Sequence, residues 1–557
     1  MTQVRPFTWR EGTGLTLISI ALTVYFTWPL SFRPGELGRL APGDGQFSVW
    51  NVAWVAHALS TGQNVFDANI FHPHKMTLAF SEANIGAGVV ALPAYILTEN
   101  PYAAHNSAVL VGLTFSVIGM YLLARRLTGN LPASLVAAVL FAFCPFLFAR
   151  TAHIQLMMTA PFPFALLAFH VFADNATAKR AFFLGVAIAA QALFCGYYGV
   201  LAGLIIGIGI LVFAVSRNMW REPRWWYLTA LAAAVSVLIV LPFFLPYIRL
   251  QDETGFGRSL DESRRYSADW RAYLASSATA HRWMLPLLGH WKEVLFPGFT
   301  ALILGAFGAV VCLRRPASVG TSVAPIRRDV AIFYSIVLVL SLWSSFGPAA
   351  GLYSLLYHTV PVFSLLRAPA RFGLAVTLAL TVFSAAGLTL LLGRLNAKAR
   401  PWVAAGVLIF AVAELSTRIP FDEARPVARP YKMLASAERG PVVELPFYFL
   451  GHDRYLQTRY MLASTTHWQP LVNGYSDFIP PDFFEGAPLL ENFPDDAGLT
   501  WLRARNTRYV MFHRHLYDNA ALTRLDERIA AHAAELRPRY VFDTIHLYEI
   551  VSPPQTR

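Results

Sequence analysis

The chain has 557 residues, of which 55% are hydrophobic and only 14% are charged, whereas soluble domains carry about 25% charged residues. This composition excludes an ordinary water-soluble protein. The net charge of +12 does not indicate nucleic-acid binding, because the basic residues are spread among short connections and form no single patch. The three cysteines, Cys144, Cys195 and Cys312, lie inside apolar blocks at spacings that fit neither a metal site nor a disulfide framework.

The first apolar block, residues 14–30, follows Arg5 and Arg10 and lacks a small-residue cleavage site. We therefore expect a retained span with a cytoplasmic N-terminus and no signal peptide. Apolar blocks of similar length recur as far as residue 419, each long enough to cross about 30 Å of hydrocarbon. About eleven spans are predicted, near residues 14–31, 105–124, 131–149, 157–173, 181–195, 199–215, 227–247, 298–313, 330–346, 372–393 and 401–419.

Clusters of basic residues fix the expected orientation of these spans. They occur in alternate short connections, including Arg125/Arg126, Arg217/Arg221 and Arg314/Arg315, as the positive-inside rule predicts for cytoplasmic loops. The other connections are then outside, and two of them, residues 32–104 and 248–297, are long. An odd number of spans also places the C-terminal region outside, so we expect a multi-pass protein of a bacterial-type inner or plasma membrane.

The C-terminal region mixes strand-like runs at residues 442–445, 509–512, 540–542 and 547–551 with a helical stretch at 522–536, a pattern typical of an α+β domain. The predicted fold class is therefore an all-α polytopic membrane domain over residues 1–419, followed by a C-terminal α+β extracytoplasmic domain over residues 420–557.

The first long loop begins with two informative features. Phe47, Trp50, Trp54 and His57 share one helical face, which predicts an amphipathic helix over residues 46–60 that lies in the headgroup layer. Before it, glycines flank Asp44 in the sequence Pro-Gly-Asp-Gly, which leaves its carboxylate accessible. Asp44 is equally suited to be the N-cap of the helix, a role worth about 1 kcal/mol.

Further along this loop lie several ionisable residues, Asp67, His72, His74, Lys75 and Glu82. A solvated loop is the structural alternative to a binding site at each of these positions. Residues 85–97 form another apolar block, but it is too short to cross a membrane.

The general plan of the chain resembles the GT-C superfamily of integral-membrane glycosyltransferases. This plan consists of one span, a long outer loop with an early acidic residue and amphipathic helices, and a C-terminal outer domain. That superfamily includes oligosaccharyltransferase catalytic subunits, protein mannosyltransferases and the lipid A aminoarabinose transferase. The resemblance implies that Asp44 is catalytic, that the donor is a polyprenyl-phosphate-linked sugar, and that transfer inverts the anomeric carbon. The acceptor would be a lipid, a glycan or a protein.

The chain departs from the superfamily in the loop after the third span. A second acidic motif is common there, but residues 150–155 contain no carboxylate. A lone aspartate is a poor ligand set for Mg²⁺ or Mn²⁺, so no cofactor is predicted and a divalent metal is not expected. His72, His74, Asp67 and Glu82 match no recognised metal-ligand spacing.

Sugar transfer from a lipid phosphate requires a base and positive charge at the leaving phosphate. Asp44 is the candidate base, and the candidate phosphate-binding residues are Arg367, Arg371, Lys75 and Arg150. Arginine suits this role because its planar fork matches phosphate oxygens, although snorkelling toward the headgroups would also explain these arginines.

Other polar and aromatic residues at outer turns or in the C-terminal region are candidates for substrate binding. These are His72, His74, Glu82, His153, Gln155, Tyr197, Tyr198, His467, Trp468 and Asn473. Helix-end polarity, aromatic-belt anchoring and ordinary domain packing are the structural alternatives. Residues 248–297 could act as a lid with a membrane-lying second half, or form a plain solvated loop.

Two other function classes remain open. A transporter usually carries ionisable residues near the middle of its spans, whereas these spans are almost free of charge, which disfavours ion coupling but not passive lipid translocation. A non-catalytic scaffold or accessory subunit of an envelope complex would retain the architecture without the chemistry.

Overall fold

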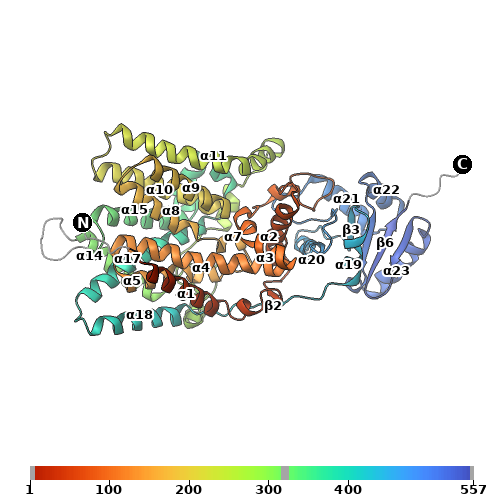
Figure 1. The fold of residues 1–557 in the computed structure, drawn as a ribbon. Coiled ribbons are helices and arrows are strands. Elements are labelled where there is room, and N and C mark those ends of the chain that lie inside the picture. The colour runs from red at the N-terminus through yellow and green to blue at the C-terminus, as the bar shows by residue number, and fades with distance from the viewer. Residues whose placement is uncertain (1–6, 315–324, 552–557) are drawn as a thin grey trace. The chain divides into compact units, whose positions relative to one another are not determined.

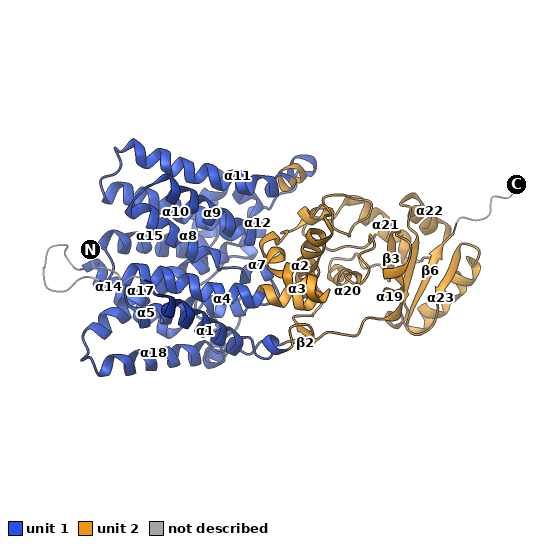
Figure 2. Ribbon diagram, in the orientation of Figure 1, with its two compact units in different colours: residues 1–32, 109–245, 251–420 blue, residues 33–108, 246–250, 421–557 orange. Residues whose placement is uncertain are grey.

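The computed structural model describes residues 7–314 and 325–551 (Figure 1). Arg5 and Arg315, which entered the topology prediction, lie outside these residues. The chain divides into two compact units (Figure 2). Unit 1 comprises Met1–Phe32, Val109–Leu245 and Gln251–Pro420, and unit 2 comprises Arg33–Ala108, Pro246–Leu250 and Phe421–Arg557.

Unit 1 is helical, and a helix is found at every predicted span. Two spans are broken into pairs of helices, and α4 and α11 each contribute a short stretch to unit 2. The helices at the predicted spans are α1 (Trp9–Phe26), α4 (Pro101–Thr128), α5 (Leu131–Ala142), α6 (Pro145–Phe148), α7 (Ile154–Met157), α8 (Pro161–Asp174), α9 (Ala178–Phe194), α10 (Gly196–Ser216), α11 (Pro223–Thr254), α14 (Phe299–Arg314), α15 (Arg328–Ser345), α17 (Gly373–Gly393) and α18 (Ala399–Leu415). The connections of unit 1 also contain the short helices α12 (Leu260–Arg265), α13 (Leu285–Leu288) and α16 (Leu352–Thr359).

Within the described residues, seven helical segments are long and apolar enough to cross a membrane. The predicted multi-pass architecture is thereby confirmed. Helices α14 and α17 make a close pair because Gly308 and Gly387 bring their backbones together. A Cβ at Gly308 would overlap the carbonyl oxygen of Phe383, and one at Gly387 would overlap that of Leu304. Small residues at such contacts are a common device in membrane proteins.

Unit 2 contains a four-stranded sheet of order β3-β4-β6-β5, with β3 (Val442–Leu445), β4 (Tyr509–His513), β6 (Ile545–Ile550) and β5 (Leu536–Tyr540). Strands β3 and β4 are parallel, and the other pairs are antiparallel. Its helices in this region are α19 (Arg429–Ser436), α20 (Thr458–Ser464), α21 (Pro481–Glu491), α22 (Asp496–Ala504) and α23 (Asn519–Ala531). The predicted α+β class is confirmed.

The first long loop also belongs to unit 2, where it forms α2 (Asp44–Thr61) and α3 (Ile85–Thr98). An extended segment between these helices pairs with a segment from the C-terminal region. Leu471 N–H donates to Asn69 O at 2.8 Å, and His72 N–H donates to Leu471 O at 2.7 Å. The first long loop therefore belongs to the same compact unit as residues 421–557. The predicted boundary between a membrane domain and an outer domain at residue 419 concerns membrane topology and stays a prediction.

The expectation that the tryptophans of α2 lie in the headgroup layer is wrong. Trp50 and Trp54 are buried inside unit 2. Their indole N–H groups donate to Asn69 Oδ1 at 3.0 Å and to Val65 O at 2.8 Å. Protein, and not lipid, covers this aromatic face. The loop after α2 also supplies the acceptors for both indole N–H groups.

Candidate functional site

Asp44 is the first residue of α2, and its side chain is exposed. The N-cap position is occupied by Gly43, without a side-chain cap, so the alternative in which Asp44 is the N-cap is wrong. In the first turn, a carboxylate interacts favourably with the helix dipole. An exposed carboxylate in this position can also accept a proton from a bound hydroxyl group.

Glycine is required on each side of Asp44 for a different structural reason. Gly43 adopts φ +102°, a backbone conformation that glycine tolerates best, and its N–H donates to Thr458 Oγ1 at 2.8 Å. Gly45 packs on the backbone of the preceding turn, where a Cβ would overlap the carbonyl oxygen of Arg39. The Asp44 backbone is therefore held on both sides by close contacts within unit 2.

A second acidic neighbourhood in unit 2 combines Glu82 with Asp477, a residue that the sequence argument did not identify. Ser81 Oγ donates to Asp477 Oδ2 at 3.1 Å. The Tyr247 hydroxyl donates to Ser81 O at 3.0 Å and accepts from Ala83 N–H at 2.9 Å. Both carboxylates act electrostatically on this hydroxyl. Only the fold reveals the pair, because Glu82 and Asp477 are far apart in the sequence.

His72 and His74 bind groups from the C-terminal region and do not assemble with Asp67 and Glu82. His72 Nε2 is 3.0 Å from Arg505 O, and His74 Nε2 is 2.7 Å from Asp482 Oδ1. Arg505 also binds Asp482, at 2.7 Å. Burial would raise the pKa of Asp482, but the hydrogen bonds from Arg505 and His74 outweigh it and lower that pKa.

These residues border a small open pocket, whose aromatic walls include Phe71, Phe483 and Trp501. Lys75 lies apart from them, largely exposed, with its Nζ 3.9 Å from Asp67 Oδ2. The histidine motif thus joins the first loop to the C-terminal region.

Three further candidates, His467, Trp468 and Asn473, have structural contacts within unit 2. Asn473 bridges the backbone of Glu444, accepting from its N–H at 2.7 Å and donating to its carbonyl at 2.9 Å. Trp468 donates to the Tyr95 hydroxyl at 3.0 Å. His467 is half-buried and stacks on Tyr431, and its partial burial lowers its pKa to about 3. These contacts match the domain-packing alternative.

In unit 1, Arg371 and Tyr197 lie side by side at the start of α17 and α10. The Arg371 guanidinium carbon is 4.7 Å from the centroid of the Tyr197 ring. The Tyr197 hydroxyl donates to Ala368 O at 2.5 Å, so the tyrosine also holds the backbone just before Arg371. Arg367 is half-buried, with its Nη1 3.7 Å from Glu262 Oε1.

Arg150 belongs to the same neighbourhood of unit 1. It forms an ion pair with Glu293, and both Arg150 and Arg371 act electrostatically on the Tyr198 hydroxyl. That hydroxyl donates to Leu156 O at 3.4 Å. The structure therefore gathers two candidate phosphate-binding arginines, from segments far apart in the sequence, around two buried tyrosines.

His153 and Gln155 flank the start of α7. His153 is its N-cap residue, without a side-chain cap, and Gln155 is the second residue of the helix. Both side chains are half-buried. Their positions at a helix end agree with the structural alternative of helix-end polarity.

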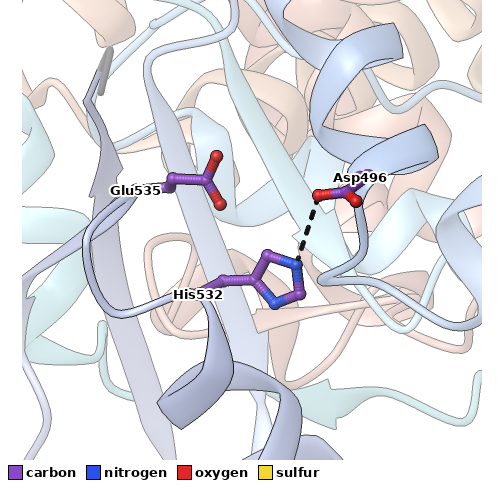
Figure 3. A group of neighbouring side chains, drawn as sticks. All are labelled: Asp496, His532 and Glu535. Atoms are coloured by element: carbon purple, nitrogen blue, oxygen red, sulfur yellow. Dashed lines mark ion pairs between the residues drawn. The ribbon is translucent and has the colours of Figure 1, made fainter. Parts of the chain in front are cut away.

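One group in the described part of unit 2 has the residue types of a metal site (Figure 3): Asp496, His532 and Glu535, whose ligand atoms lie within 4.8 Å of one another. His532 Nε2 is 3.7 Å from Asp496 Oδ1. Arg503 Nη2 lies 3.1 Å from Glu535 Oε1, and the Asp496 side chain is fully exposed. Because Arg503 already balances the charge of Glu535, the group does not need a metal ion.

Comparison with protein-family models gives no match. Among curated proteins, the chain is 28% identical over 278 residues to the undecaprenyl phosphate-alpha-4-amino-4-deoxy-L-arabinose arabinosyl transferase of Pseudomonas paraeruginosa. The match covers 48% of this chain and 47% of that protein, so it spans about half the length of the curated relative.

The solved structures that match the chain include ArnT from Cupriavidus metallidurans in the apo state, at 14% identity and TM-score 0.49, covering 98% of this chain and 99% of that chain. The same protein bound to undecaprenyl phosphate matches at 13% identity and TM-score 0.46, covering 97% and 98%. The archaeal oligosaccharyltransferase AglB from Archaeoglobus fulgidus matches at 14% identity and TM-score 0.43, covering 98% and 75%. The curated sequence relative confirms the resemblance of the chain to GT-C membrane glycosyltransferases.

Proposed function

We propose that this protein is a membrane glycosyltransferase that moves a sugar from a polyprenyl-phosphate carrier to an acceptor hydroxyl. The observation that carries the proposal is the exposed carboxylate of Asp44, held at the first turn of α2 by Gly43 and Gly45. A rigidly presented carboxylate is what general-base catalysis needs. The sequence similarity to the arabinosyl transferase of Pseudomonas paraeruginosa supports the same reaction class.

In the proposed reaction, Asp44 takes the proton of the acceptor hydroxyl as its oxygen forms a bond with the anomeric carbon. The bond from that carbon to the phosphate oxygen breaks, and the carrier leaves as polyprenyl phosphate. Arg371, Arg367 and Arg150 bind the phosphate and stabilise its growing negative charge. Lys75 is a further candidate for binding the donor phosphate. The acceptor is a lipid, a glycan or a protein.

The reaction would take place on the extracytoplasmic face. The alternation of basic connections supports this side for the two long loops and a cytoplasmic side for the N-terminus. No metal ion is needed in this scheme, because the arginines provide the positive charge at the phosphate.

Replacing Asp44 by Asn tests the proposed base. Removing a general base costs about 10²- to 10⁴-fold in rate, so D44N should lose turnover to that extent while the protein remains folded and membrane-inserted. Asp496 offers a matched control, because it is also an exposed aspartate in the first turn of a helix. D496N should retain the wild-type rate.

The assay measures release of polyprenyl phosphate from a panel of lipid-linked sugars in proteoliposomes. Equal rates in D44N and wild type would reject Asp44 as the base and favour the scaffold or lipid-translocation alternatives. Equal losses in D44N and D496N would show that the effect is structural.

A second experiment tests the phosphate site. Each charge-assisted hydrogen bond is worth about 1.5–3 kcal/mol, so Arg371→Gln should raise the KM for the donor by about tenfold or more. The control is Arg394→Gln, since Arg394 also stacks over an aromatic ring, Phe307, in unit 1. An unchanged donor KM in R371Q would exclude Arg371 from the phosphate site.

A further inference from the structure

A short segment of the second long loop, residues 279–292, exposes large apolar side chains in an arrangement that protein packing does not explain. It consists of η3 (Thr279–Met284), α13 (Leu285–Leu288) and four following residues. Trp283 is 61% exposed, Leu287 76% and Trp291 36%. On the opposite side of the same segment, His281, Met284 and Leu288 are buried.

Large apolar side chains thus lie on both the buried and the exposed side of this segment. A group of exposed large apolar side chains indicates an apolar partner, and unit 1 covers only the buried side. Trp283 lies in η3 and Leu287 in the following helix α13, and both side chains are largely exposed. Tryptophan is also the residue most typical of the boundary between hydrocarbon and water.

Hydrogen bonds fix this segment at the ends of two apolar helices of unit 1. Thr279 N–H donates to Ser416 O at 2.9 Å, just beyond α18. His281 Nε2 lies 3.1 Å from Glu414 Oε1, and Glu414 in turn accepts from Thr300 N–H at 3.1 Å in the first turn of α14. The segment thus lies where α14 begins and α18 ends, which is the level of the membrane surface for the spans predicted at residues 298–313 and 401–419.

The charge of the segment is complementary to an anionic surface. Residues 279–292 contain Arg282 and Lys292 and no acidic residue, and both basic side chains are exposed. Basic residues beside exposed tryptophans are the composition of a segment that inserts its apolar side among lipid chains and binds anionic headgroups.

We infer that residues 279–292 form a lipid-binding surface, in which Trp283, Leu287 and Trp291 insert into the bilayer boundary while Arg282 and Lys292 bind anionic phospholipid headgroups. The occupant is the bilayer. This inference is independent of the proposed enzymatic activity, because it rests on exposure, charge and attachment to the ends of α14 and α18.

Site-directed spin labelling of the full chain in lipid nanodiscs tests insertion. The three native cysteines are buried, so a nitroxide attached to Leu287→Cys reports on that position. Phe542→Cys is the matched control, because Phe542 is also a large apolar residue with 70% exposure, but it lies in the turn between β5 and β6. The label at position 287 should collide more with oxygen than with a water-soluble nickel complex, and the label at 542 should show the reverse. Similar accessibilities at the two positions would overturn insertion.

Native mass spectrometry tests headgroup binding, with nanodiscs of phosphatidylcholine and phosphatidylglycerol as the probe. The double variant Arg282→Gln/Lys292→Gln should retain less phosphatidylglycerol, by about fivefold for each charge removed. The control is Arg264→Gln/Arg265→Gln, which removes two exposed basic residues elsewhere in the same loop. Equal retention in the two double variants, whether reduced or unchanged, would overturn the specific contact with anionic headgroups.

Discussion

Gly45 provides the sharpest test of how the fold presents Asp44. In Gly45→Ala, the new methyl group would overlap the carbonyl oxygen of Arg39. Because that oxygen belongs to the backbone, it cannot rotate away, and the first turn of α2 must shift by roughly 1 Å. Overpacking of this kind costs about 1–3 kcal/mol, partly offset by the preference of helices for Ala over Gly, worth about 0.5–1 kcal/mol. We expect a net loss of stability between about 0 and 2.5 kcal/mol.

The shift should affect catalysis more than stability. A displacement of about 1 Å in a catalytic group can reduce the rate about 100-fold, so G45A should release polyprenyl phosphate slowly while retaining a cooperative thermal transition. The control is Gly207→Ala in α10, since a Cβ at Gly207 meets nothing within 4 Å. Wild-type turnover in G45A would refute the idea that the close contact with Arg39 positions Asp44. Slow turnover in both variants would point to a general effect of alanine.

Three further predictions concern the surroundings of the candidate site. Tyr197→Phe removes the hydrogen bond to Ala368 and should raise the donor KM more than it lowers kcat, as steady-state kinetics would reveal; a fall in kcat alone would contradict this. Glu262→Gln removes a carboxylate that competes with phosphate for Arg367, so donor affinity measured by equilibrium binding should rise, and weaker binding would argue against the phosphate role. His467 has a folded-state pKa of about 3, below its ordinary value of about 6.5, so protonation favours the unfolded chain. The contribution of neutral His467 to the free energy of unfolding is therefore complete above pH 6.5. It falls by about 1.4 kcal/mol per pH unit as the pH drops toward 3. Thermal melts of His467→Asn should therefore depend less on pH in this range than those of wild type, and identical pH profiles would contradict the assignment.

Local patterns in the sequence predict much of the fold. Each apolar block became a helix, because backbone groups in an apolar environment must pair within the segment itself. The strand-like run at residues 442–445 became β3, and the run at 509–512 became most of β4. Such predictions succeed because length and periodicity are properties of the segment alone. The flanking glycines likewise mark Asp44 as unusual without reference to any other part of the chain.

Local patterns in the sequence do not determine what an apolar or polar face packs against. The aromatic stripe of α2 predicts burial equally well against lipid or protein, and only the tertiary structure shows Trp50 and Trp54 inside unit 2. His72 and His74 bind Arg505 and Asp482, because the segment that contains His72 pairs through its backbone with the C-terminal region. The spacing of residues along the chain does not predict such a pairing.

The sequence by itself determined that this is a multi-span membrane protein with a C-terminal α+β region and a carboxylate set between two glycines. The tertiary structure decided which arginines act on one group: Arg150 and Arg371 both act electrostatically on the Tyr198 hydroxyl, although more than half of the predicted spans separate them. The physical reason is that helix formation depends on neighbours along the chain, whereas a binding site depends on which helix ends pack together.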